Sequence, residues 1–412
     1  MQDPLPELPT TPEDVLALLD GTASPATVAS AGGRYFGFVT GGALPATVAA
    51  NWLATVWDQN SFNNVSSPAI ALIEATALRW VKEALDLPVT AEGTFVTGAT
   101  MANFTCLAAA RQRVLKDAGW DVDRNGLFGA PEIDVIVGEE VHATIFKVLS
   151  MLGLGRDRVI RVPADDQGRM RADALPVIDK PTIVCIQAGN VNSGAFDPAP
   201  EIIAAARKAG AWVHVDGAFG LWARAAPRLA PLAAGLENAD SWATDAHKWL
   251  NVPYDCGVAL VREPEDLRRA MSISGAYLLA SEQRDQIDYS PDSSRRARAV
   301  DVWAALKSLG KAGLAELIDR NARQAVQLAD VLRRNNIEIL NDVVLNQVVA
   351  AFGETERTGR VIDAIQRDGT CWAGATDWQG RTAMRISVSA WATTDADIER
   401  SLGAILQAHR DA

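Results

Sequence analysis

Two residues, Asp216 and Lys248, are of types that could together bind and activate a small organic cofactor. Asp216 ends the apolar run AWVHVD and is followed by the small residues of GAFG. Lys248 follows in the segment SWATDAHKWLN, directly after His247. Taken singly, each has an ordinary explanation. Asp216 could be a strand-end carboxylate that caps a turn, and Lys248 a surface lysine whose stem packs beside Trp249.

Together, these two residues are the minimum that pyridoxal phosphate (PLP) chemistry requires. A lysine amine forms a Schiff base with the aldehyde of this cofactor, and a carboxylate keeps its pyridine nitrogen protonated. PLP also needs a phosphate site. The segment TGATMANFTCLAAAR predicts one, because Gly98, Ala99 and Thr100 stand between a strand and a helix whose first-turn amides can face an anion. Such a turn alone does not distinguish a phosphate site from an ordinary β-to-α connection.

A histidine follows another predicted strand, in VGEEVHATIFKVL, at position 142. A lone histidine is more often a core or surface residue, but in a PLP site a histidine is the usual ring that lies flat on the cofactor. The chain has four histidines, and three of them, His142, His214 and His247, fall within the segments that carry the candidate chemistry. Only His409 does not.

The elements that must position these residues follow from the periodicity of the apolar residues. Between residues 49 and 298, apolar runs of strand length alternate with longer helical patterns. This alternation predicts a mostly parallel sheet covered on both faces, with the site at the carboxyl ends of the strands. The predicted strands are 93–97, 134–137, 182–187, 211–215 and 257–261, and the predicted helices are 68–85, 101–116, 142–152 and 201–209.

A smaller α+β domain is predicted after the sheet. A long helical pattern at 300–334 leads into strands near 343–352 and 383–389, and Thr394 caps a last helix. Before the sheet, proline, glycine and alanine dominate, apart from a short helix at 12–19 that the Thr10–Thr11 pair opens. We therefore expect an N-terminal arm at 1–45, a large domain at 46–299 and a small domain at 300–412.

Composition excludes several classes of function. The net charge of −12 over 412 residues argues against nucleic acid or an anionic membrane as the main partner. The four cysteines are scattered without a CxxC pair, which favours buried core residues over a zinc site or disulfides. The acidic, proline-rich N-terminus is not a secretory signal, and no apolar run approaches the ~18 residues of a membrane span. We expect a cytoplasmic protein without metal.

The sequence resembles the group II PLP-dependent amino acid decarboxylases, the family of the aromatic-L-amino-acid, glutamate and diaminobutyrate decarboxylases. The resemblance runs in order from about residue 36 to residue 298. It rests on the segments SSPAIALIEATALRWV, TGATMANFTCLAAAR, QAGNVNSGAFDP, HVDGAFG and DSWATDAHKWLNVPYDCGVALV. It implies an α/β protein of PLP fold type I, aspartate aminotransferase-like, with a smaller C-terminal α+β domain. It also implies a homodimer with shared active sites that acts on an amino acid.

The resemblance also implies roles for single residues. Lys248 is the Schiff-base lysine, Asp216 is the partner of the pyridine nitrogen, and His142 is the stacking imidazole. Ala218 packs on the other face of the ring. The phosphate site comprises Gly98, Ala99, Thr100 and His247. His247 precedes Lys248 because one anchors the phosphate while its neighbour reaches the aldehyde.

Two further residues complete the implied cofactor site. Asp245 lies in the same turn as the lysine and is assigned to cofactor binding. The second is less direct, because many family members have Gly-Thr-Thr where this chain has GNVN at 189–192. Asn192 is our candidate to replace the missing threonine. The segment GGRYFGFVTGG also departs from the family pattern, so the resemblance does not identify the substrate.

PLP alone does not decide the reaction. Tyr277, in MSISGAYLLASEQRDQIDYS, falls on the loop tyrosine of the family, and a phenol there can return a proton to the carbon that has lost CO2. Decarboxylation is therefore the preferred reaction, with an aminotransferase, a carbon–carbon lyase, an oxidative deaminase and a catalytically silent binding protein as alternatives. Arg385, in TAMRISVSAW, is either a carboxylate-binding residue or part of a structural ion pair.

Overall fold

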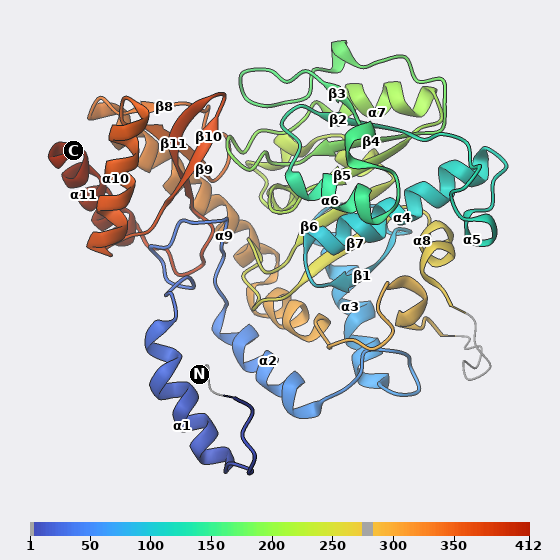
Figure 1. Cartoon of the computed structure of the whole chain (residues 1–412), viewed down its shortest axis with the longest axis horizontal. Coiled ribbons are helices and arrows are strands. Elements are labelled where there is room, and N and C mark those ends of the chain that lie inside the picture. The colour runs from blue at the N-terminus through green and yellow to red at the C-terminus, as the bar shows by residue number, and fades with distance from the viewer. Residues whose placement is uncertain (1–3, 274–282) are drawn as a thin grey trace.

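The computed structural model describes residues 4–273 and 283–412. The described chain contains a seven-stranded sheet with helices on both faces and a separate four-stranded sheet near the C-terminus (Figure 1). The long helix α9 (Ala299–Arg334) runs between them, with non-helical backbone angles at Gly310. Its first half packs into the core of the large sheet, and its last turns pack into that of the small one.

The large sheet has the strand order β1-β7-β6-β5-β4-β2-β3. Strands β2 to β6 pair in parallel, whereas β7 is antiparallel to both of its neighbours, β1 and β6. The sheet is thus mostly parallel, as the alternation of strand and helix predicted. The strands are β1 (Glu92–Val96), β2 (Asp134–Gly138), β3 (Ile160–Val162), β4 (Thr182–Gln187), β5 (Trp212–Asp216), β6 (Ser241–Asp245) and β7 (Gly257–Val261).

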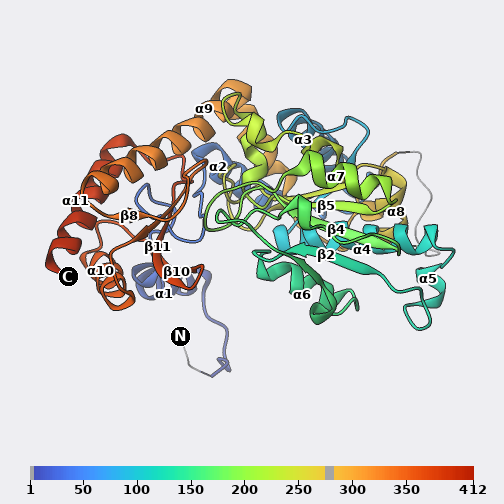
Figure 2. The same ribbon diagram turned by 90° about the horizontal axis from the view of Figure 1, so that it is seen from above.

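Helices cover both faces of this sheet, and Figure 2 shows the resulting layers. One face packs against α4 (Ala99–Asp117), α6 (Ala143–Met151) and α8 (Pro264–Met271). The other face packs against α3 (Pro68–Ala84), α7 (Ala199–Lys208) and the first half of α9. Strands buried on both faces explain the continuous apolar runs in the sequence.

The small sheet is antiparallel, with the order β10-β11-β9-β8. Its strands are β8 (Glu338–Ile339), β9 (Gln347–Ala351), β10 (Gly374–Trp378) and β11 (Arg381–Ser387). The last turns of α9 pack on it together with α10 (Thr355–Asp368) and α11 (Asp395–Asp411). Helix α11 begins at a capping box formed by Thr394 and Asp397, which confirms the predicted cap.

The N-terminal segment contains α1 (Pro12–Thr22), capped by Thr11, and α2 (Pro45–Trp57). Helix α1 buries none of its residues and extends away from the body (Figure 1). The remaining short elements are α5 (Val122–Asn125) and the 3₁₀ turns η1 (Ser24–Ala26), η2 (Arg156–Arg158), η3 (Ala172–Ala174), η4 (Gly220–Ala225), η5 (Ala230–Ala233), η6 (Leu236–Asn238) and η7 (Gln286–Tyr289).

Strands β3 and β6 were not among the predicted elements. Strand β6 has the sequence SWATD, in which three of the five residues are polar, yet all five are buried. The burial of its polar residues reflects contacts with both neighbouring strands and with α4. The periodicity of apolar residues did not predict this strand, because a periodicity argument assigns polar residues to solvent.

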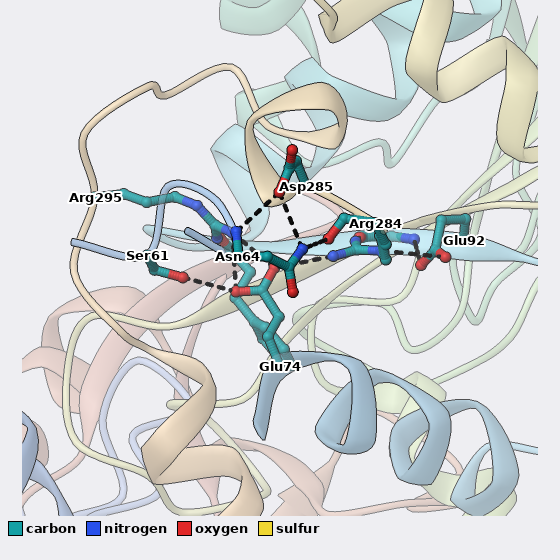
Figure 3. Close-up of polar contacts among 9 residues, drawn as sticks. Ser61, Asn64, Glu74, Glu92, Arg284, Asp285 and Arg295 are labelled. Carbon is teal, nitrogen blue, oxygen red and sulfur yellow. Dashed lines mark hydrogen bonds and ion pairs between the residues drawn. The ribbon is translucent and has the colours of Figure 1, made fainter. Parts of the chain in front are cut away.

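A buried ionic network joins α3 to the segment that follows residue 283 (Figure 3). The carboxylate of Glu74 accepts two hydrogen bonds from Nη2 of Arg295, at 2.7 and 2.8 Å, and one from the hydroxyl of Ser61 at 3.0 Å. The side chains of Glu74 and Arg295 are each 1 % exposed. Arg284 lies beside them and pairs with Glu92 at 3.3 Å. The network fixes residues 284–295 against β1 and α3.

Candidate active site

A cavity of about 320 Å³ lies at the carboxyl ends of the parallel strands. This volume is within the range of small-molecule sites. Strands β1, β2, β4, β5 and β6, or the loops that follow them, all contribute to its walls. The lining residues are Thr97, Gly98, Ala99, Thr100, His142, Thr144, Gln187, Gly189, Val191, Asp216, Ala218, Phe219, Asp245, His247 and Lys248.

Most residues predicted for the site line this one cavity. They are Gly98, Ala99, Thr100, His142, Asp216, Ala218, Asp245, His247 and Lys248. Asn192 and Arg385 are not among the lining residues. Tyr277 lies outside the described residues.

The amine of Lys248 is held by an acid three residues before it. Its Nζ lies 3.0 Å from Oδ2 of Asp245. The other oxygen of Asp245 accepts the backbone N–H of Ala99 at 2.6 Å. A single carboxylate therefore connects the lysine to the N-terminus of α4, so the lysine and the helix end share one side of the cavity.

His247 has its tautomer set by the backbone. Its Nδ1 accepts the N–H of Cys256 at 3.1 Å, so in the neutral ring the proton is on Nε2. Burial lowers the pKa of His247, which favours this neutral form, although the nearby carboxylate of Asp245 acts in the opposite direction. His247 lines the cavity and can therefore donate a hydrogen bond from Nε2 to an anion there.

The N-terminus of α4 reaches the cavity because two glycines pack back to back. A Cβ atom on Gly257 would lie 2.5 Å from the backbone of Gly98. This close approach brings the first turn of the 19-residue helix α4 beside the turn that carries Lys248. The helix end presents partial positive charge, and the hydroxyl of Thr100 adds a further donor at the cavity wall.

His142 is the N-cap of α6. Its Nδ1 lies 2.8 Å from Oγ1 of Thr144 and accepts the backbone N–H of Thr144 at 3.4 Å. Burial lowers the pKa of His142; the charge of Asp216 raises it, and the charges of Lys248 and Arg385 lower it. A neutral imidazole held at both its ring nitrogen and its backbone suits a residue that stacks on a flat ring.

Asp216 ends β5 and is 7 % exposed. Its Oδ2 accepts a hydrogen bond from Nδ2 of Asn103, on α4, at 3.2 Å. Burial raises the pKa of Asp216, whereas electrostatic interaction with His142 and Lys248 and the hydrogen bond from Asn103 lower it. A cation in the cavity would have the same effect, since an opposite charge favours the ionised carboxylate.

Asn192 and Arg385, which do not line the cavity, lie beside each other. Oδ1 of Asn192 accepts the hydroxyl of Thr376 at 2.8 Å and lies 3.5 Å from Nη1 of Arg385. Within residues 4–273 and 283–412, no carboxylate forms an ion pair with Arg385. Burial lowers the pKa of this guanidinium.

Several lining residues were not identified from the sequence. They are Thr97, Thr144, Gln187, Gly189, Val191 and Phe219. Gln187 ends β4, and its Nε2 donates to the carbonyl of Glu140 at 3.0 Å. Its position in the sequence could have identified Gln187, because it ends a predicted strand whose carboxyl end lies at the same edge of the sheet as Asp216.

The residues present fit PLP. The cavity walls carry a primary amine, a buried carboxylate, a helix N-terminus and a histidine whose Nε2, 3.5 Å from Oδ1 of Asp245, carries the proton of the neutral ring. These groups match the aldehyde, the pyridine nitrogen and the phosphate of this cofactor. Over the described part of the chain, no group of three or more His, Cys, Asp or Glu side chains could hold a metal ion. The four cysteines are all buried and free, as expected.

No helix within the described ranges is long and apolar enough to cross a membrane.

Relatives of known activity share most of the chain. Over 386 residues it is 26% identical to an aromatic-L-amino-acid decarboxylase of Bacillus atrophaeus, a match that covers 88% of this chain and 78% of the relative. Over 393 residues it is 28% identical to an L-2,4-diaminobutyrate decarboxylase of Rhizobium meliloti, covering 90% and 76%.

The fold is also that of a solved decarboxylase. The crystal structure of Oryza sativa TDC with PLP and tryptamine matches with a TM-score of 0.90 and 22% sequence identity, over 100% of this chain and 90% of the other. At this identity the likeness shows the fold alone. It confirms the predicted α/β fold with a smaller C-terminal part.

The family itself follows from a match over most of the chain. Residues 9–352 match the pyridoxal-dependent decarboxylase conserved domain. The chain therefore belongs to the family of pyridoxal-dependent decarboxylases, which are carboxy-lyases that use pyridoxal phosphate as cofactor.

Proposed function

We propose that the chain decarboxylates an L-amino acid to the corresponding amine and CO2. The observation that carries the proposal is the placement of the Lys248 amine and the buried Asp216 carboxylate on the walls of one cavity. The decarboxylases among its relatives support the reaction type. Their names include aromatic and diamino substrates, so the substrate class stays open between aromatic, diamino and short acidic amino acids.

When bound, PLP supplies an electron sink that stabilises the negative charge left on carbon as CO2 departs. Lys248 would hold the cofactor covalently through its amine. Asp216 keeps a proton on the pyridine nitrogen, which the carboxylate can do only while it is ionised. His142 would present its imidazole to the ring, and Ala218 would be small enough to allow close packing on the other face. The first turn of α4 and His247 would bind the phosphate.

Arg385 is our candidate for holding the carboxylate of the amino acid. Its guanidinium has no acidic partner in the described part of the chain, and its charge acts on His142 at the cavity. A bidentate carboxylate would satisfy such a group. Asn192 lies 3.5 Å from Nη1 and would orient the guanidinium, which is a different role from the cofactor contact expected from sequence.

Tyr277 is proposed as the proton donor. This assignment rests on its match to the loop tyrosine of the family. Its phenol would deliver a proton to the carbon that lost CO2, giving the amine. Without that proton, oxidation by dissolved oxygen would compete and yield an aldehyde, ammonia and hydrogen peroxide.

The proposed assembly is a homodimer whose two sites include residues of both subunits. Exposed apolar residues on α2 support it, because a helix with this surface is unusual for a monomer. Trp52 is 68 % exposed, Leu53 51 % and Val56 81 %.

The decisive experiment is a CO2-release screen of PLP-loaded protein across the amino acids, with product analysis under air and under nitrogen. Amine and CO2 in equal amounts support the proposal. A keto acid without CO2 would indicate an aminotransferase, an aldehyde without CO2 a carbon–carbon lyase, and an aldehyde with peroxide an oxidative deaminase. In a decarboxylase, Tyr277→Phe should still release CO2 but should form less amine by roughly 10²–10⁴-fold. An unchanged amine yield would remove Tyr277 from the mechanism.

A further inference from the structure

A line of buried hydrogen bonds runs from the interior of the large sheet to Asp216. Nε1 of Trp212 donates to Oγ of Ser241 at 2.9 Å. Oγ of Ser241 lies 2.9 Å from Nδ1 of His214, and Nε2 of His214 lies 2.9 Å from Oδ1 of Asn103. Nδ2 of Asn103 then donates to Oδ2 of Asp216 at 3.2 Å. All five residues are buried, and three of them are 0 % exposed.

The chemistry of the groups sets the direction of every hydrogen in this line. An ionised carboxylate only accepts, so the amide nitrogen of Asn103 faces Asp216 and its oxygen faces His214. An amide oxygen also only accepts, so Nε2 of His214 carries the proton. Its Nδ1 is then an acceptor and receives the hydroxyl proton of Ser241, whose oxygen is left to accept from Trp212. All four bonds point toward Asp216.

Burial keeps the histidine in this line neutral. It lowers the pKa of His214 to about 3, so near pH 7 the ring holds one proton. A charged imidazole would carry protons on both nitrogens and could not accept from Ser241. The line therefore keeps one arrangement, and bonds aligned in one direction strengthen each other.

We infer that Asn103 is a positioning residue for Asp216, oriented in turn by His214 and Ser241, and that this one-way line keeps the carboxylate ionised and fixed at the cavity wall. The inference rests on the proposed use of Asp216 as the partner of the pyridine nitrogen. It assigns a function to two polar residues, Asn103 and His214, that do not line the cavity.

Other charged groups act on Asp216 from the cavity side. His142 comes from the start of α6, and Lys248 and Asp245 come from β6 and the turn after it. Two of these groups carry or can carry positive charge, but both face the cofactor and change their environment when it binds. Asn103 acts from behind, in the protein interior, and its contribution is independent of what occupies the cavity.

The test uses PLP labelled with ¹⁵N at the pyridine nitrogen, bound to the full-length protein. The ¹⁵N chemical shift reports directly whether that nitrogen is protonated. In Asn103→Leu, which keeps the approximate volume but removes the donor, the shift should move toward the unprotonated value at pH 7. The dissociation constant for PLP should rise by roughly tenfold or more, since a hydrogen bond to a charged group is lost.

Two further variants test the order along the line. His214→Phe keeps a ring but removes the hydrogen bond to the amide oxygen of Asn103. Ser241→Ala removes the hydrogen bond to Nδ1 of His214. Their ¹⁵N shifts should change in the same direction as that of Asn103→Leu, and by progressively smaller amounts. A purely structural role would lower stability without this order. If Asn103→Leu does not fold, His214→Phe decides the question.

Asn346→Leu is the matched control. Asn346 is also 0 % exposed and hydrogen-bonded, to the Val388 carbonyl at 3.1 Å and to Ser389 Oγ at 3.0 Å, but it makes no contact with Asp216. This variant should lose stability and keep the wild-type ¹⁵N shift. A fully protonated nitrogen in folded Asn103→Leu, or in His214→Phe if the first does not fold, would overturn the inference. Failure of the wild type to bind PLP would instead remove the proposed function.

Discussion

The amine of Lys248 and the carboxylate of Asp245 form an ion pair with 3.0 Å between Nζ and Oδ2, and Asp245 is buried. Lys248 thus has two proposed roles with different requirements. Covalent attachment of PLP needs its amine, whereas neutralisation of the buried Asp245 needs only a positive charge.

We therefore expect Lys248→Ala and Lys248→Arg to differ. Both should lose the borohydride-stable adduct with PLP, because neither offers an amine. Lys248→Ala should also lower the free energy of unfolding by about 1–3 kcal/mol, since the buried Asp245 loses its ion pair with the lysine. Lys248→Arg should be closer to wild type. Mass spectrometry of the reduced protein and urea denaturation measure the two effects. Labelling of another lysine in either variant would refute the assignment.

Asp216→Asn should retain PLP through Lys248 but lose activity. A neutral amide cannot stabilise a protonated pyridine nitrogen, so we expect turnover to fall by at least roughly 10²-fold while the borohydride-stable adduct still forms. Asp301→Asn is the control, because it makes the same change at another buried carboxylate outside the cavity. Turnover of Asp216→Asn near the wild-type value would exclude the proposed role.

Asp301 predicts a pH dependence of stability. Burial raises the pKa of this carboxyl to about 6, although the hydrogen bond from Asn51 opposes the shift. Between about pH 4 and pH 6 the folded state then holds a proton that the unfolded state has lost. Stability from this group is thus present at low pH and decreases by about 1.4 kcal/mol per unit as the pH rises through this window.

The measurement is the difference in unfolding free energy between the wild type and Asp301→Asn from pH 4 to pH 8. We expect the unfolding free energy of the wild type to fall relative to that of Asp301→Asn as the pH rises to about 6. Above that pH the difference should stay constant. Subtracting the variant removes the contributions of other titrating groups, His214 among them. A difference that is constant over the whole range would show that Asp301 ionises normally.

The ionic network around Glu74 should dominate local stability. Glu74→Ala leaves Arg295 buried without its acid, and we expect a loss of about 3–5 kcal/mol in the free energy of unfolding. Glu338→Ala is the matched control, because Glu338 and Arg381 form a similar two-bond pair at the surface. Its removal should cost under about 1 kcal/mol. Similar losses in the two variants, by chemical denaturation, would contradict the importance of burial here.

The proposed dimer can be tested on α2. Val56→Glu places a charge among exposed apolar residues and should shift the protein toward monomer in size-exclusion chromatography with light scattering. Val177→Glu makes the same substitution at a residue 88 % exposed in the connection before β4 and should leave the assembly unchanged. A monomeric wild type would remove the dimer proposal, and a dimeric Val56→Glu would remove α2 from the interface.

The amino-acid sequence was sufficient for the class of fold and for most of the site. Its alternation of apolar runs and helical patterns predicted the parallel sheet, because strands buried on both faces must be apolar throughout. Asp216 and His142 could be placed near each other because each ends or follows a predicted strand, and the carboxyl ends of parallel strands meet at one edge. Lys248 was assigned to the same site through the family resemblance, because the strand before it, β6, was not predicted.

Only the tertiary structure decided how these residues are held. The sequence does not show that Asp245 pairs with Lys248 and also accepts the N–H of Ala99. These two partners of Asp245 lie 149 positions apart in the chain (248 − 99). The line from Trp212 through His214 to Asn103 was equally hidden. Its members lie on two strands and a helix, and their polarity is compatible with burial only because each donor meets an acceptor there. Periodicity reports which face of an element is apolar, whereas pairing of buried polar groups depends on how the elements pack.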